Sequence, residues 1–113
     1  MTITEQHAVV EDWIAATDSH DLMRYLAHFN EDAVLDDPSV GRQFNGRGEI
    51  AEYFRSYFIG YNTRTRLLGT EARGGLLHVE VDFTGDFPGG QTGGTFDLTF
   101  DGERIANATA DLT

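Results

Sequence analysis

The sequence contains no cysteine, few basic residues, two prolines and no long apolar run. The lack of cysteine excludes disulfide bonds and thiol catalysis and is consistent with a reducing compartment. No apolar run approaches the roughly 20 residues that a membrane-spanning helix needs. The first residues also lack the basic and then apolar pattern of a secretory signal. We therefore expect a cytoplasmic protein that does not associate with membranes.

The shortage of basic side chains also limits the possible partners. Eight basic residues stand against 19 acidic ones, which gives a formal net charge of −11. Such a surface repels phosphate groups, so binding to nucleic acid or to an anionic membrane surface is disfavoured.

What the sequence does contain is typical of a folded globular protein. It has 113 residues, of which 40% are hydrophobic and 12% aromatic. This composition is sufficient for one hydrophobic core, so we expect a single domain over residues 1–113.

The first half of the chain has the periodicity of helices. Apolar residues at three- and four-residue spacings predict a helix over residues 4–18, with Thr2 or Thr4 as a possible cap. Asp21 is a plausible N-cap for a shorter helix whose apolar face extends to Phe29. A short strand over residues 34–36 and a loop over 39–45 precede a third helix, over 48–58.

The second half alternates with the period of strands. We expect four strands, over residues 64–73, 76–87, 95–100 and 104–112, joined by glycine-containing turns. Three helices followed by a four-stranded meander predict an α+β fold, in which the helices pack on one side of an antiparallel sheet.

Metal and phosphate sites are not indicated. The four histidines, at positions 7, 20, 28 and 78, have no paired ligand spacing. The glycine-rich segment at residues 89–94 lies between two predicted strands, where it makes a turn and not a phosphate-binding loop. We therefore expect neither a metal nor a cofactor.

The residues that could carry chemistry are two carboxylates and a tryptophan. Asp37 precedes Pro38, which restricts it to extended backbone geometry at a strand end. Asp97 is flanked by Phe96 and Leu98, and Trp13 lies on the apolar stripe of the first helix. Burial would raise the pKa of such a carboxyl group, so that it could accept or donate a proton near neutral pH.

Each of these residues has a simpler interpretation. Asp37 is compatible with a surface turn, Trp13 with an ordinary core position, and Asp97 with the solvent face of an alternating strand. If Asp97 lay opposite Asp82, two like charges would meet, whereas pairing opposite Phe83 would put Asp97 on the apolar side. We favour the second arrangement.

Three segments resemble a known family. VVEDWIAATDSHDLMRYLAHFNEDAVLDDP, NGRGEIAEYF and GTFDLTFDGERI are similar to segments of bacterial ketosteroid isomerases and of the SnoaL-like proteins related to them. Both groups belong to the NTF2-like superfamily, whose fold is a cone: three helices over a curved antiparallel sheet that encloses a pocket. The resemblance covers nearly the whole chain, but the superfamily contains several kinds of enzyme as well as binding modules.

The resemblance implies roles for particular residues. Asp37 matches the isomerase's catalytic base, and Asp97 matches the protonated aspartic acid of its oxyanion hole. Trp13 stands where the isomerase has its oxyanion-hole tyrosine, and Phe29 and Phe54 stand where it has supporting tyrosines. The carboxylates are therefore retained, whereas the phenol network is not.

Together these observations favour a cofactor-free isomerase that moves a proton α to the carbonyl of a hydrophobic, steroid- or polyketide-like molecule. Asp37 would be the base and Asp97 the oxyanion donor, with Trp13 beside it. The expected pocket lining is apolar and aromatic: Phe29, Phe54, Tyr57, Val81 and Phe83. The alternatives are a binding module without catalysis and a SnoaL-type cyclase.

The expected orientation of Asp97 has a further consequence. If Asp97 faces the pocket, then Phe96, Leu98 and Phe100 lie on the outer face of the sheet. An exposed apolar stripe of this kind usually marks an interface. We therefore expect a homodimer that packs sheet against sheet.

Overall fold

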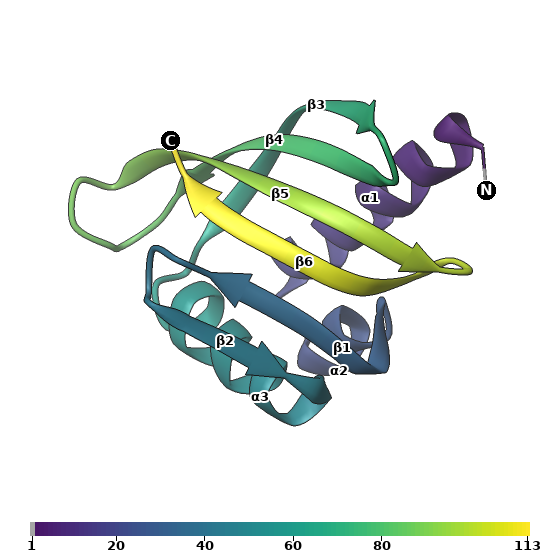
Figure 1. Ribbon diagram of the computed structural model, residues 1–113. Helices are drawn as coiled ribbons and strands as arrows, with labels where there is room; N and C mark the ends of the chain where they lie inside the picture. The colour runs from purple at the N-terminus through teal and green to yellow at the C-terminus, as the bar shows by residue number, and fades with distance from the viewer. Residues whose placement is uncertain (1) are drawn as a thin grey trace.

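Six strands form one curved sheet in the computed structural model, which describes residues 2–113 (Figure 1). The strand order across the sheet is β2-β1-β6-β5-β4-β3. The elements, in chain order, are α1 (Ile3–Ser19), α2 (Leu22–Leu26), β1 (Phe29–Asp37), β2 (Arg42–Asn45), α3 (Gly46–Phe54), the π-helix η1 (Arg55–Ile59), β3 (Arg64–Arg73), β4 (Leu76–Thr84), β5 (Gln91–Asp101) and β6 (Arg104–Leu112). In Figure 1, α1 lies behind the strands β3 to β6, and α3 lies beside β1 and β2.

The helices begin where the sequence predicted. The side chain of Thr2 accepts a hydrogen bond from the backbone N–H of Glu5 at 3.1 Å and caps α1. Asp21 caps α2 in the same way through the N–H of Arg24. Each cap satisfies an N–H group that has no partner inside its helix, which stabilises the helix by about 1 kcal/mol. The apolar stripe of α1 faces the core with Val10, Trp13 and Ile14 buried.

The order and antiparallel pairing of the predicted meander are confirmed, but β4 ends at Thr84 and β5 begins at Gln91, so residues 91–94 of the expected turn pair within the sheet. β3, β4, β5 and β6 pair in chain order, and each pairing is antiparallel. Gly74 and Gly102 adopt positive φ angles of 60° and 61° in two of the turns, a conformation that residues with a side chain rarely adopt.

Two expectations about the first half of the chain were wrong. The segment 42–45, expected as a loop, forms the strand β2, which pairs antiparallel with β1. β1 itself begins at Phe29, where we expected the end of a helix. In both strands alternation buries one side: Phe29 and Leu35 are fully buried, and Phe44 of β2 packs against Tyr53.

The sheet is mixed and not purely antiparallel. β1 pairs parallel with β6, with Leu35 opposite Ala108, and so joins the first half of the chain to the meander. This pairing links distant parts of the sequence, so no local pattern of alternation could reveal it.

The third helix changes its geometry at Phe54. Beyond this residue the chain continues as the π-helix η1, in which the N–H of Gly60 donates to the carbonyl of Arg55 at 2.8 Å. Short π-helical turns are rare and occur often at functional sites. Here the π-helical turn places Tyr57 and Phe58 over the concave face of the sheet.

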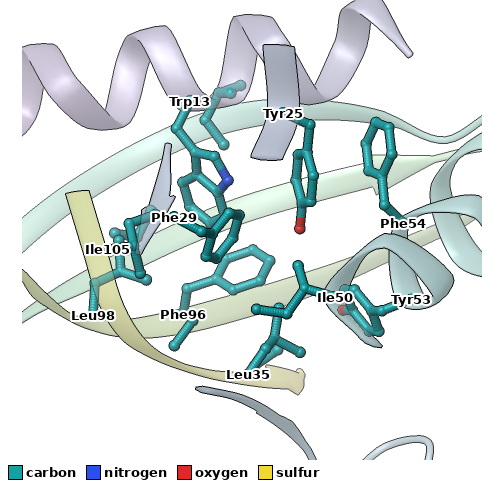
Figure 2. Close-up of a cluster of buried hydrophobic side chains, with 14 of the residues drawn as sticks. Trp13, Tyr25, Phe29, Leu35, Ile50, Tyr53, Phe54, Phe96, Leu98 and Ile105 are labelled. Carbon is teal, nitrogen blue, oxygen red and sulfur yellow. The ribbon is translucent and has the colours of Figure 1, made fainter. Parts of the chain in front are cut away.

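Aromatic side chains dominate the core (Figure 2). The Trp13 ring packs edge-on against Phe96, with centroids 5.0 Å apart, and Tyr25 stacks on Phe54 at 3.9 Å. Such pairs add about 0.5–1.5 kcal/mol each to the free energy gained from burial alone. No helix in the described part of the chain is long and apolar enough to cross a membrane.

We predict that Gly94→Ala destabilises the protein by about 1–3 kcal/mol because it overpacks the core. A β-carbon at Gly94 would lie 2.4 Å from the Phe83 ring and 3.2 Å from the carbonyl oxygen of Asp111. Urea denaturation followed by circular dichroism measures the change. Gly75→Ala is the matched control, because its β-carbon would meet no atom within 4 Å. Equal stability of the two variants would contradict the packing argument.

We also predict that stability falls as the pH rises above about 10. Burial raises the pKa of the Tyr25 hydroxyl far above its ordinary value, so Tyr25 keeps its proton in the folded state and loses it on unfolding. The unfolded state then binds fewer protons, and the free energy of unfolding falls by up to about 1.4 kcal/mol per pH unit for this group. Below pH 10 its contribution does not change.

Urea titrations at pH 8, 10 and 11 test this prediction. Tyr25→Phe should weaken the loss of stability between pH 10 and 11, whereas Tyr61→Phe, at a ring that is 37% exposed, should leave it unchanged. A Tyr25→Phe protein with the same alkaline loss as wild type would show that Tyr25 does not cause it.

Candidate functional site

A cavity of about 210 Å³ opens between η1 and the concave face of the sheet. Its walls are largely aromatic, and its polar lining residues are three tyrosines, two threonines, two aspartates and a serine. The lining residues are Asp37, Ser39, Val40, Tyr53, Tyr57, Phe58, Tyr61, Thr63, Phe83, Phe87, Thr92, Phe96, Ala110, Asp111 and Leu112.

Asp37 is the most buried carboxylate in this cavity, with 6% of its surface exposed. Strand alternation points it inward together with Leu35, and Pro38 then ends β1. Its Oδ1 accepts hydrogen bonds from the backbone N–H of Ser39 at 3.0 Å and from the Ser39 hydroxyl at 2.5 Å. Its Oδ2 accepts a hydrogen bond from the hydroxyl of Tyr53 at 2.9 Å. The carboxylate is thus fixed by three hydrogen bonds.

All three donors to Asp37 are neutral. Among residues 2–113, no arginine or histidine lies within ion-pair distance of its oxygens. Burial raises the pKa of the Tyr53 hydroxyl well above its ordinary value, and the nearby Asp37 carboxylate raises it further. Tyr53 therefore remains protonated and donates its hydrogen bond at any physiological pH.

Asp97 does not face the cavity, so this expectation was wrong. Phe96 lines the cavity and Leu98 is fully buried in the core, so alternation puts Asp97 on the outer face of β5. Its side chain is 38% exposed, and Oδ1 lies 2.7 Å from Nδ1 of His78. The residue opposite Asp97 in the sheet is His78, not Phe83 or Asp82. The Asp97 side chain therefore lies on the opposite face of the sheet from the cavity, where it does not donate to a ligand in the cavity.

The same result removes the reason for expecting a dimer. Phe96 and Leu98 lie in the core, and Phe100 packs at its edge, so they do not form an exposed apolar stripe. The polar residues Asp97 and Thr99 alternate with them and point the other way. A homodimer through the sheet face stays a prediction without this support.

The other expected site residues divide into two groups. Tyr57 and Phe83 line the cavity. Phe29, Phe54 and Val81 are buried in the core and do not line it.

Trp13 also lies in the core and not in the cavity wall, with 2% of its surface exposed. Its indole N–H has no hydrogen-bond partner among the described residues. Figure 2 shows this nitrogen on the edge of the ring that faces Tyr25. Trp13 therefore supports the fold beneath the cavity and does not reach a ligand within it.

Sequence analysis missed the phenol that contacts Asp37. The resemblance directed attention to Phe54, whereas the residue before it, Tyr53, makes the hydrogen bond. A signal was present in the four-residue spacing of Tyr53 and Tyr57, which predicts one side of a helix for both; Tyr61 follows at the same spacing, just beyond the end of η1 at Ile59. All three line the cavity.

The described residues contain no group of three or more histidine, aspartate or glutamate side chains placed to hold a metal ion. What the cavity offers is a fixed carboxylate, neutral hydroxyl groups and aromatic walls. This arrangement is suited to binding an apolar molecule and to exchanging a proton with it.

Comparison with known proteins identifies the family. The model of the SnoaL-like domain matches residues 10–108. No curated protein matches the chain.

Several solved structures share the fold. A protein from Sinorhizobium meliloti, provisionally assigned as a polyketide cyclase, is 22% identical with a TM-score of 0.82, over 91% of this chain and 93% of its own. A protein from Kribbella flavida, provisionally assigned as a ketosteroid isomerase, is 14% identical with a TM-score of 0.82, over 97% and 78% of the two chains. A de novo designed protein with a curved sheet reaches a TM-score of 0.80 at 15% identity, over 100% and 88%.

At these identities the likeness shows the fold alone, and a fold does not by itself define an activity. The domain match, in contrast, covers most of the sequence, and the α+β cone agrees with it. The chain therefore belongs to the SnoaL-like family of the NTF2-like superfamily.

Proposed function

We propose that this protein is a cofactor-free enzyme that moves a proton α to the carbonyl group of a small hydrophobic molecule, with Asp37 as the base. The observation that supports the proposal is the state of Asp37: it is buried in an aromatic cavity and held only by neutral donors. No arginine or histidine among residues 2–113 pairs with its oxygens, so the carboxylate stays accessible to a ligand in the cavity.

Asp37 retains a free acceptor position. Each carboxylate oxygen has two lone pairs. Oδ1 receives two hydrogen bonds from Ser39, whereas Oδ2 receives one, from Tyr53. Oδ2 would therefore take the proton from the substrate carbon and return it to a second carbon of the resulting enolate.

A hydrogen-bond donor for the enolate oxygen is also available. Because Asp97 lies on the other face of the sheet, we assign this role to Tyr57, whose ring lies 5.4 Å from that of Tyr53. Tyr57 lines the cavity, and its hydroxyl makes no hydrogen bond within residues 2–113. A neutral phenol placed at the developing negative charge stabilises the transition state without donating a full proton.

The size of the cavity limits the substrate. About 210 Å³ is below the roughly 300–1,000 Å³ of ligand pockets in general. A single ring fits this space, whereas a larger molecule would extend out through the mouth. We therefore favour a small cyclic ketone, or one ring of a larger polyketide-like or steroid-like molecule.

Two other functions are compatible with the same cavity. A SnoaL-type cyclase would use Asp37 as acid and base in an aldol closure, and a binding module would use only the aromatic walls. Both agree with the family. The proton-transfer proposal differs from the binding module because it requires the carboxylate itself.

The proposal predicts that Asp37→Asn lowers kcat/KM by at least about 100-fold, because an amide does not accept the proton. The assay follows the ultraviolet absorbance of the conjugated enone formed from cyclohex-3-en-1-one and, separately, from androst-5-ene-3,17-dione. Asp97→Asn is the matched control and should keep wild-type turnover, since Asp97 lies on the outer face.

Equal turnover by wild type and Asp37→Asn would exclude Asp37 as the base. If wild type converts neither ketone, the isomerase proposal fails for these substrates, and the cyclase and the binding module become the leading candidates.

A separate prediction concerns the hydroxyl group of Tyr57. Tyr57→Phe should lower kcat by about 100- to 1,000-fold with a smaller effect on KM, because it removes a donor that acts mainly in the transition state. Steady-state kinetics with the better of the two ketones measures this. An unchanged kcat would exclude Tyr57 as the oxyanion donor.

A further inference from the structure

Two aromatic side chains border the mouth of the cavity. Tyr61 and Phe87 both line the cavity and both reach the solvent, since Tyr61 is 37% exposed and Phe87 is half-buried. Their rings lie 6.0 Å apart at an angle of 82°, so the edge of one ring packs against the other. The other aromatic rings of the lining are buried, apart from the half-buried Tyr57. A ligand that enters the cavity therefore passes this pair.

The Phe87 ring packs against its own loop. Phe87 belongs to the segment 85–90, which joins β4 to β5. A β-carbon at Gly85 would lie 3.0 Å from the Phe87 ring and 2.9 Å from the carbonyl oxygen of Tyr61. Any side chain at this position would therefore displace either the ring or the backbone beside it. Glycine at position 85 allows the ring to occupy its place at the mouth.

Backbone hydrogen bonds hold this loop. The N–H of Asp86 donates to the carbonyl of Tyr61 at 2.7 Å and ties the loop to the segment that follows η1. Within the loop, the N–H of Gly85 donates to the carbonyl of Gly90 at 3.2 Å, and the N–H of Gly90 donates to the carbonyl of Phe87 at 2.9 Å. A ligand therefore meets the Phe87 ring already in position and does not have to order it.

The space behind this ring is small. The cavity of about 210 Å³ accepts a single ring, and Asp37 lies in its wall with 6% of its surface exposed. A ligand whose first ring contacts the Asp37 carboxylate fills this space. Any further ring of the same ligand has to leave through the mouth, where it meets Phe87.

We infer that Phe87 determines the size of the ligand, because its fixed ring closes the mouth behind a single ring and excludes molecules that continue beyond it. This inference rests on the proposed function only in taking the cavity as the substrate site. Of the substrates left open there, it selects the small cyclic ketone over one ring of a larger molecule. Phe87 is a specificity-determining residue and not a catalytic one, since its side chain has no polar atom.

The test compares two ligands that present the same ring to Asp37. 3,4-Dimethylphenol is the phenol ring of estradiol with methyl groups at the two positions where the steroid continues. Equilibrium dialysis at neutral pH, where both phenols keep their protons, gives the two dissociation constants. The greater apolar surface of estradiol by itself favours estradiol. We expect the opposite for wild type, with 3,4-dimethylphenol bound at least about tenfold more tightly.

Variants assign the exclusion to Phe87. Phe87→Ala should bind estradiol at least about tenfold more tightly than wild type does, while 3,4-dimethylphenol stays within about threefold. Phe87→Leu should shift estradiol in the same direction by a smaller factor. Phe100→Ala is the matched control, because it removes an equal ring from the edge of the core, outside the cavity lining. It should leave the ratio of the two constants unchanged, and retained binding of 3,4-dimethylphenol shows that each variant is folded.

Equal or tighter binding of estradiol by wild type would overturn the inference, and so would binding of neither ligand. An unchanged ratio in Phe87→Ala, or the same change in Phe100→Ala, would show that Phe87 does not set the size limit. Since binding requires no turnover, the result is separate from the ketone assay. Conversion of ketones without this size preference would refute only the inference, whereas a size preference that depends on Phe87 without any conversion would refute only the proposed isomerisation.

Discussion

The structure depends on one continuous set of aromatic contacts. Neighbouring rings touch from the centre of the core to the mouth of the cavity, in the order Phe29, Trp13, Phe96, Phe83, Phe58, Tyr53, Tyr57, Tyr61 and Phe87. These rings come from α1, β1, the third helix with its π turn, the strands β4 and β5 and a loop, so they join the helices to the sheet. All the rings of the set except those of Phe29 and Trp13 line the cavity. Core and candidate site are thus parts of one arrangement, and a change in Phe83 or Phe96 affects both.

The position of Asp37 follows from this arrangement. A charged group in an aromatic environment is unstable unless it is hydrogen-bonded. Ser39 and Tyr53 provide these bonds without supplying a positive charge. The protein therefore holds a carboxylate in a largely aromatic cavity through hydrogen bonds from neutral groups alone.

Much of this could be predicted from the sequence, and the failures have physical causes. Local signals found the helix caps, the meander and Asp37, because each depends on residues close in the chain. For Asp97, alternation with Phe96 and Leu98 was compatible with the outer face, but we favoured a pairing opposite Phe83, whereas the residue opposite Asp97 is His78. Neighbouring residues of a helix, such as Tyr53 and Phe54, are both buried here, so composition did not show which side chain meets Asp37. Which of the two side chains contacts Asp37 depends on the path of the backbone and on contacts between distant parts of the chain.

The parallel pairing of β1 with β6 affects how the chain folds as it is synthesised. β1 is made early, yet its partner on one side is the last strand of the sheet. Until β6 emerges from the ribosome, β1 pairs only with β2 and has one unpaired edge. During this time the Leu35 side chain is not yet buried by the complete sheet. Exposed strand edges and apolar side chains promote association between nascent chains. The strand that carries Asp37 therefore keeps one unpaired edge until β6 has been made.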